Sequence, residues 1–145
     1  VTPMILITGW KHVARFRRLI GLFAFFYAVL HVTSYVALDQ GLDWPSIYND
    51  IIKRVYIMVG LAAFIILTIL AATSQSTIVK RLGNKVWKRI HQGAYIAGVL
   101  GTTHFMMMRK GFQIEPLIYT GILVALLGTR VVFYVKKRAL NRIKA

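Results

Sequence analysis

The chain has 145 residues, of which 57% are hydrophobic, and it carries a formal net charge of +15 with no cysteine. The lack of cysteine excludes a disulfide framework, a thiolate metal site and an iron–sulfur cluster within these residues. The basic residues cluster beside long apolar runs, so they are expected to flank membrane spans. Nucleic-acid binding is not expected.

Four apolar segments are each long enough to cross a hydrocarbon core of roughly 30 Å as a helix. They lie at residues 19–38, 55–72, 90–108 and 116–134. Residues 1–10 are apolar but shorter, and are predicted to be the tail of a preceding span. The predicted fold is therefore all-α, a polytopic membrane helical bundle in which residues 1–145 form a single domain.

The charges differ between the two sides of this predicted bundle. Four spans place the N-terminus, residues 73–89 and the C-terminus on one side, with most of the 19 Lys and Arg residues. Residues 73–89 are predicted to be a basic loop, with a turn at Gly83 and Asn84. All four acidic residues lie on the other side, in the segments before the second and fourth spans. Positively charged loops favour the cytoplasm, so the basic side is predicted to be cytoplasmic. On the acidic side, Trp44 and Tyr48 are expected either to reach the lipid headgroups or to pack the loop.

Two histidines lie within the predicted spans at matched depth. At about 1.5 Å per residue, His31 in the first span and His104 in the third fall in the same half of the membrane, on helices that run in the same direction. Each lies above a stripe of small residues on its helix face: Ala28, Ala24 and Gly21 in the first, and Gly101, Ala97, Ala94 and Gly93 in the third. Two facing histidines above such a groove suit a haem held by axial imidazoles. The alternative is an interhelical hydrogen bond between closely packed helices.

A second, inner site is less complete. His91 lies thirteen residues before His104, which places the two rings about 140° apart on an ideal helix. The residue fourteen positions before His31 is Arg17. A two-haem arrangement would require another histidine at this position. Three interpretations stay open: an inner haem with an unusual second ligand, an Arg17 that serves only a propionate, or no inner haem and an interfacial His91. His12 lies in a basic segment and is not expected to be a ligand.

Five stretches of the chain carry a family resemblance. They are RRLIGLFAFFYAVLHVTSY (17–35), KRVYIMVG (53–60), ATSQSTIVKRLGNKVWKRIH (72–91), THF (103–105) and PLIYTGIL (116–123). With these motifs the chain resembles the MsrQ (YedZ) family of haem-binding membrane subunits, within the ferric-reductase-like transmembrane group that includes NADPH oxidases. That family usually has about six spans, and this chain looks like the last four.

The resemblance implies b-type haem, one or two per chain, and electron transfer across the bacterial inner membrane. The implied acceptor is MsrP, a periplasmic molybdenum enzyme that reduces methionine sulfoxide in oxidised proteins. The implied donor is the quinone pool or a cytosolic flavin reductase, and FMN is a possible further cofactor. The chain would then be the electron-transfer subunit and not the catalytic one.

The family's ligand positions carry over to His31, His91 and His104, and the oxidase relatives have a histidine where this chain has Arg17. Only a short basic tail follows Tyr134, so the reductant is expected on a separate partner. Two alternatives remain: the cytochrome b subunit of another reductase, such as a ferric reductase, and a small transporter without haem whose histidines relay protons.

Overall fold

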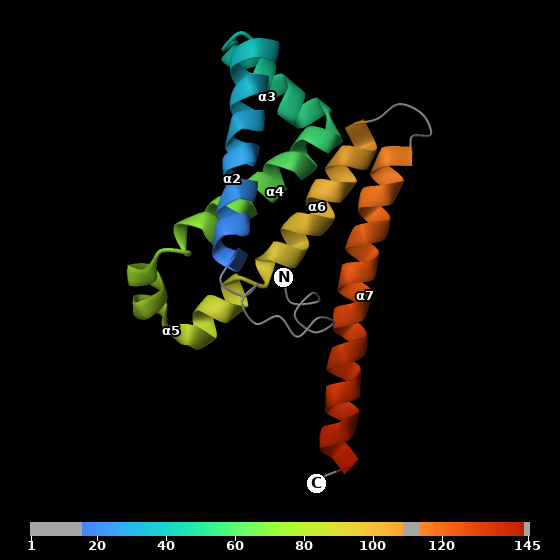
Figure 1. Cartoon of the computed structure of the whole chain (residues 1–145). Helices are drawn as coiled ribbons and strands as arrows, with labels where there is room; N and C mark the ends of the chain where they lie inside the picture. Colours follow the sequence, from blue (N-terminus) through green and yellow to red (C-terminus); the bar gives the residue numbers. More distant parts are fainter. Residues whose placement is uncertain (1–15, 109–113, 144–145) are drawn as a thin grey trace. The chain divides into compact units, whose positions relative to one another are not determined.

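The computed structural model describes residues 16–108 and 114–143, and this part of the chain is helical, without strands. The helices are α2 (Phe16–Ser34), the π-helical turn η2 (Tyr35–Asp39), α3 (Trp44–Lys53), α4 (Val55–Ala72), α5 (Ser76–Ile90), α6 (Gly93–Met108) and α7 (Ile114–Ile143) (Figure 1). Of these residues, 18–108 belong to one compact unit, and α7 belongs to a second. The all-α prediction is confirmed, whereas the predicted tail at residues 1–10 lies outside the described residues.

Three of these helices are long and apolar enough to cross a membrane: Phe16–Asp39, Val55–Ala72 and Ile114–Lys136. They coincide with the first, second and fourth predicted spans. The third predicted span, 90–108, is shorter in the structure, because α5 continues to Ile90 and α6 begins only at Gly93 with 16 residues. The chain is thus a helical membrane protein, and the number of four spans stays a prediction.

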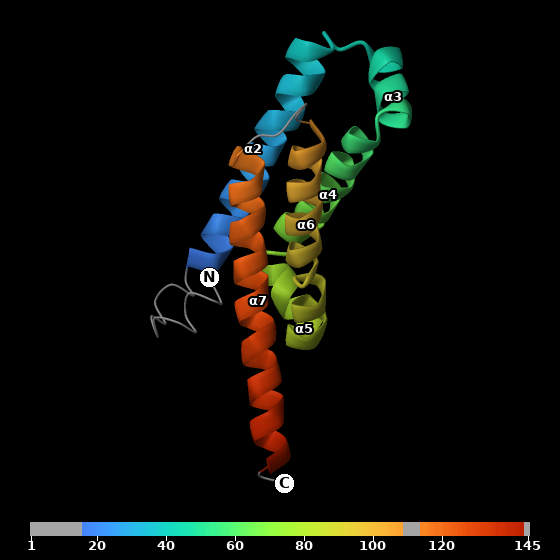
Figure 2. The same ribbon diagram turned by 90° about the vertical axis from the view of Figure 1, so that its right-hand side faces the viewer.

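The closest helix packing in the first unit is between α4 and α6, which lie side by side in both ribbon views (Figures 1 and 2). Small residues allow this approach. Ala63 on α4 and Ala97 on α6 are buried, and a Cβ added to Gly93 would lie 3.3 Å from Cγ2 of Ile66 on α4. Part of the small-residue stripe predicted beside His104 therefore packs against α4.

Helix α3 connects α2 to α4 at one end of this unit (Figure 2). The chain turns into it at Gly41 and Leu42, both with positive φ, and Asp43 caps its first turn by accepting a hydrogen bond from the Ser46 amide. Ile47 points inward and is buried. Trp44 and Tyr48 are 66% and 68% exposed, so they do not pack the loop as one of the two sequence interpretations held.

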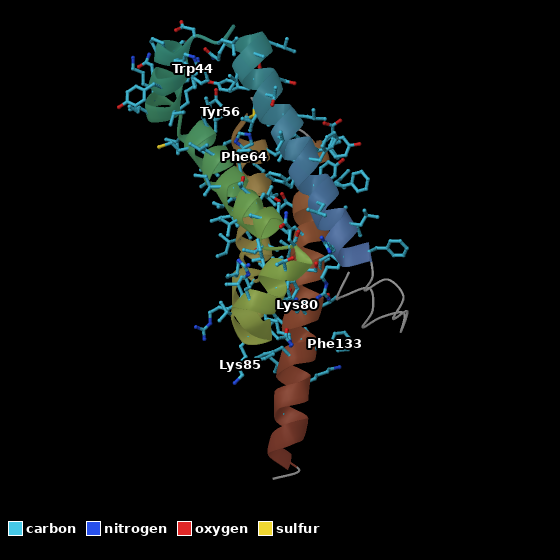
Figure 3. All side chains as sticks on the ribbon, turned by 90° about the vertical axis from the view of Figure 1, so that its left-hand side faces the viewer. Trp44, Tyr56, Phe64, Lys80, Lys85 and Phe133 are labelled. Carbon is cyan, nitrogen blue, oxygen red and sulfur yellow. The ribbon has the colours of Figure 1, made fainter. Side chains whose placement is uncertain are left out.

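Helix α5 lies at the opposite end, where the sequence predicted a basic loop with a turn at Gly83 and Asn84. The structure instead forms a helix over Ser76–Ile90, and the backbone is non-helical only at Gly83, with φ 74° and ψ 154°. The segment is amphipathic: its lysines and arginines are exposed, whereas Leu82 and Trp87 are partly covered. Figure 3 shows Lys80 and Lys85 on this helix and Trp44 and Tyr56 near the other end of the unit.

Helix α7 is described by itself. It runs from Ile114 to Ile143, beyond the predicted end at residue 134, because the basic segment that follows contains no helix breaker. Pro116 lies in its first turn, where its missing amide proton costs no helical hydrogen bond. The Pro116 carbonyl accepts a hydrogen bond from the Thr120 hydroxyl at 2.7 Å.

Candidate functional site

The structure brings together His31 of α2 and His104 of α6. Their ring centroids lie 6.2 Å apart, and the rings meet edge to face at 72°. A ligating imidazole nitrogen lies about 2 Å from its metal ion, so two imidazoles on opposite sides of one ion have ring centres roughly 6 Å apart. The observed separation therefore fits a pair of axial ligands as well as it fits two packed rings.

The ring of His104 is oriented by the backbone of α4. Nδ1 of His104 lies 2.7 Å from the carbonyl oxygen of Tyr56. A carbonyl oxygen can only accept a hydrogen bond, so Nδ1 carries the proton and donates it. The lone pair of Nε2 is then available for a metal ion. Histidine ligands in metalloproteins are commonly fixed in this way, through the ring nitrogen that does not bind the metal.

Gly60 makes the contact between His104 and α4 possible. A Cβ added to Gly60 would lie 2.7 Å from Nδ1 and 2.8 Å from Cε1 of His104, closer than side-chain atoms pack. The imidazole thus rests on a bare Cα one turn after Tyr56. Sequence reasoning assigned no role to Gly60 or to the Tyr56 carbonyl, and the available signal was a single glycine inside an apolar span.

The small-residue faces beside the two histidines are open only in part. Added Cβ atoms at Gly21 on α2 and at Gly101 on α6 would meet no other atom within 4 Å. Ala97, in contrast, is buried. The helix faces are therefore open at Gly21 and Gly101, where a flat group could approach the backbones.

His91 lies in the turn between α5 and α6 and contacts other partners. Its Nε2 is 3.2 Å from the Thr73 hydroxyl, and its ring stacks on Trp87 with centroids 4.2 Å apart. The Trp87 indole donates to the Thr73 carbonyl at 3.1 Å. These contacts fit the interpretation of His91 as an interfacial histidine, while its role as an iron ligand stays a prediction.

Arg17 lies in the first turn of α2 and is exposed; its predicted role toward a propionate or an inner haem stays a prediction. His12 lies outside the described residues. Among the residues that the structure describes, no group of three or more His, Cys, Asp or Glu side chains is placed to hold a metal ion. A two-histidine set is insufficient for a bare ion but suits a haem, whose macrocycle supplies the remaining ligands.

Comparison with known proteins places these features in a family. The family described as "Ferric reductase like transmembrane component" matches residues 1–102. The protein-methionine-sulfoxide reductase heme-binding subunit MsrQ of Rhodospirillum rubrum is 50% identical over 141 residues, which are 97% of this chain and 68% of that protein. MsrQ of Polaromonas naphthalenivorans is 47% identical over 134 residues, covering 90% of this chain and 61% of the relative.

A further relative has a different name. The magnetosome protein MamZ of Magnetospirillum gryphiswaldense is 44% identical over 128 residues, which are 88% of this chain but 20% of that longer protein. The chain thus spans only part of the length of each of these relatives. No solved structure matches this chain.

Proposed function

The chain belongs to the ferric-reductase-like transmembrane family, with MsrQ haem-binding subunits among its relatives, and from this premise we propose that it is a b-type haem protein that carries electrons across the bacterial inner membrane. The observation that supports the proposal most is the His31–His104 pair, 6.2 Å apart between ring centroids. The hydrogen bond from His104 to Tyr56 adds to it, because it leaves Nε2 available.

In this proposal His31 and His104 are the residues that would hold the haem iron. When bound, the haem would supply a reversible one-electron ferric–ferrous couple. The Tyr56 carbonyl keeps the proton of His104 on Nδ1 and fixes the orientation of the ring. Arg17 is proposed to pair with a haem propionate, and His91 would hold a second haem where one is bound.

The proposed acceptor is a periplasmic, MsrP-like molybdenum enzyme that reduces methionine sulfoxide in oxidised proteins. The relatives named MsrQ support it, since their names give them as subunits of a protein-methionine-sulfoxide reductase. The histidine pair lies toward the α3 end of the unit, where Asp39, Asp43 and Asp50 also lie. Because the opposite, basic side is predicted to be cytoplasmic, the pair would stand near the periplasmic side, on which this acceptor docks.

The proposed donor acts on the other side, where the basic helix α5 lies. It is either a membrane quinone or a cytosolic flavin reductase, and FMN would accompany the second. A second candidate function is direct reduction of ferric chelates, which the description of the matching family favours.

Proteoliposomes with a reductant sealed inside would separate these functions. We expect the haem to become reduced, and to be reoxidised when an MsrP-like enzyme and methionine sulfoxide are added outside. His31→Ala and His104→Ala should abolish both steps, whereas the matched control His12→Ala should not. Reoxidation by ferric citrate without the enzyme would favour ferric reduction, and a colourless protein that takes up no haemin would favour the transporter alternative.

A further inference from the structure

Asp50 on α3 is the centre of a polar network that joins three segments of the chain. One of its carboxylate oxygens accepts hydrogen bonds from the Tyr35 hydroxyl and the Gln40 side-chain amide, each at 3.0 Å. The other lies 3.0 Å from Nε of Arg54. Its side chain is only 13% exposed. A carboxylate with three donors in this setting forms charge-assisted bonds, which are stronger than neutral ones.

Two arms of this network lead to the two histidines. Tyr35 follows His31 by four residues, so it lies about one helical turn further along the same face of its segment. Arg54 donates from its guanidinium to the Tyr56 hydroxyl at 3.0 Å. The backbone carbonyl of Tyr56 then accepts the Nδ1 proton of His104 at 2.7 Å.

Apolar packing does little to fix α2. None of its residues is buried, and it meets α4 through the stacked rings of Phe25 and Phe64, with centroids 6.1 Å apart. Helix α6, in contrast, packs closely along α4. Polar links at the end of α2 are therefore needed to hold its histidine at a defined distance from α6.

We propose that Asp50 is a positioning residue that sets the separation and relative orientation of the two histidine rings, by binding the end of α2 through Tyr35 and the start of α4 through Arg54. The inference rests on the proposed function, in which the pair holds the haem iron. Asp50 itself touches neither ring in this account. It acts through Tyr35 on one side and through Arg54 and Tyr56 on the other.

The helix arrangement can be tested without haem, because the chain contains no cysteine. Spin labels at Leu30→Cys on α2 and Ile69→Cys on α4, both exposed, report the distance between the two helices. We expect Asp50→Asn and Tyr35→Phe to broaden the distance distribution. The matched control Asp39→Asn removes the same charge from an exposed position at the end of η2 and should leave the distribution unchanged.

The haem supplies the second readout. The g values of a low-spin ferric haem respond to the relative orientation of the two imidazoles that hold it. A loss of overall stability does not change that orientation in the haem that remains bound. We expect changed g values, a shifted midpoint potential and a roughly tenfold lower haemin affinity in Asp50→Asn, as for loss of a charge-assisted bond. Asp50→Glu should restore the g values in part.

The outcomes separate this inference from the proposed function. Unchanged distances and g values in Tyr35→Phe overturn the positioning role, even where Asp50→Asn fails to accumulate. Equal effects of Asp39→Asn and Asp50→Asn overturn it as well. A wild-type protein that binds no haem defeats the proposed function, while the spin-label distances still decide whether Asp50 positions α2.

Discussion

The substitution Gly60→Ala tests whether the contact between α4 and His104 prepares this histidine for a metal ion. The added Cβ would lie 2.7 Å from Nδ1 and 2.8 Å from Cε1 of the ring, whereas carbon atoms pack at about 3.5–4.0 Å. The ring must therefore move by about 1 Å. Because its hydrogen bond to the Tyr56 carbonyl is 2.7 Å long, that movement takes the bond beyond the usual limit of about 3.2 Å.

The expected cost appears in haem affinity and not in stability. Loss of an outer partner of a histidine ligand costs about 10–100-fold in metal affinity, or about 1.4–2.8 kcal/mol. Alanine is a better helix former than glycine by about 1 kcal/mol, which offsets the roughly 1 kcal/mol lost with the hydrogen bond, so the haem-free Gly60→Ala protein should melt close to the wild type. Titration of the purified apoprotein with haemin, followed by Soret absorbance, measures the affinity, and a thermal melt measures the stability.

Gly121→Ala on α7 is the matched control, since its Cβ would meet no atom within 4 Å and it gains the same helix propensity. It should bind haemin as the wild type does. Wild-type haemin affinity in Gly60→Ala would refute the reasoning, because it would mean that the contact of His104 with α4 has no part in ligation.

Three further substitutions probe the groove, the His91 contacts and the α3 cap. Gly101→Leu fills space that is open in the structure, so haemin binding should be lost at an unchanged melting temperature. The control Val99→Leu on the same helix should bind haemin normally, and equal binding by the two variants would show that haem does not need the space at Gly101. Thr73→Val removes the hydroxyl next to His91 and should lower stability by about 1 kcal/mol, which a lower melting temperature would reveal and an unchanged one would contradict. Asp43→Ala removes the side-chain cap of α3 and should also cost about 1 kcal/mol in thermal unfolding, with the haem spectrum intact; a changed spectrum would show that α3 contributes to the site beyond its cap.

The proximity of His31 and His104 could be predicted from the sequence, because depth along a membrane helix follows from counting residues and both helices run in the same direction. Their contact needed no knowledge of side-chain packing. The arrangement of His91 could not be obtained in this way. The position of His91 depends on the turn that separates α5 from α6 and on its stacking with Trp87. The sequence analysis used a continuous ideal helix from residue 90, which includes neither the turn nor the stacking.

The contacts that orient the His104 ring could not be predicted from the sequence either. The partner of Nδ1 is a backbone carbonyl, which every residue possesses, so the residue type of Tyr56 gives no indication of it. Gly60 matters only because α4 and α6 approach closely at that height. For α5 the sequence prediction of a loop was wrong. Gly83 correctly indicated a break in the backbone, but the amphipathic segments on both sides of it form helix.

The most direct test of the central claim is the haem content of the purified protein, measured by the pyridine haemochrome assay together with protein quantification. The account predicts at least one b-type haem per chain in the wild type, and its loss in both His31→Ala and His104→Ala. The assay also distinguishes one haem from two, and so decides whether a second haem is bound. If both single variants keep a full low-spin b-type spectrum, the assignment of this pair as the axial ligands is wrong.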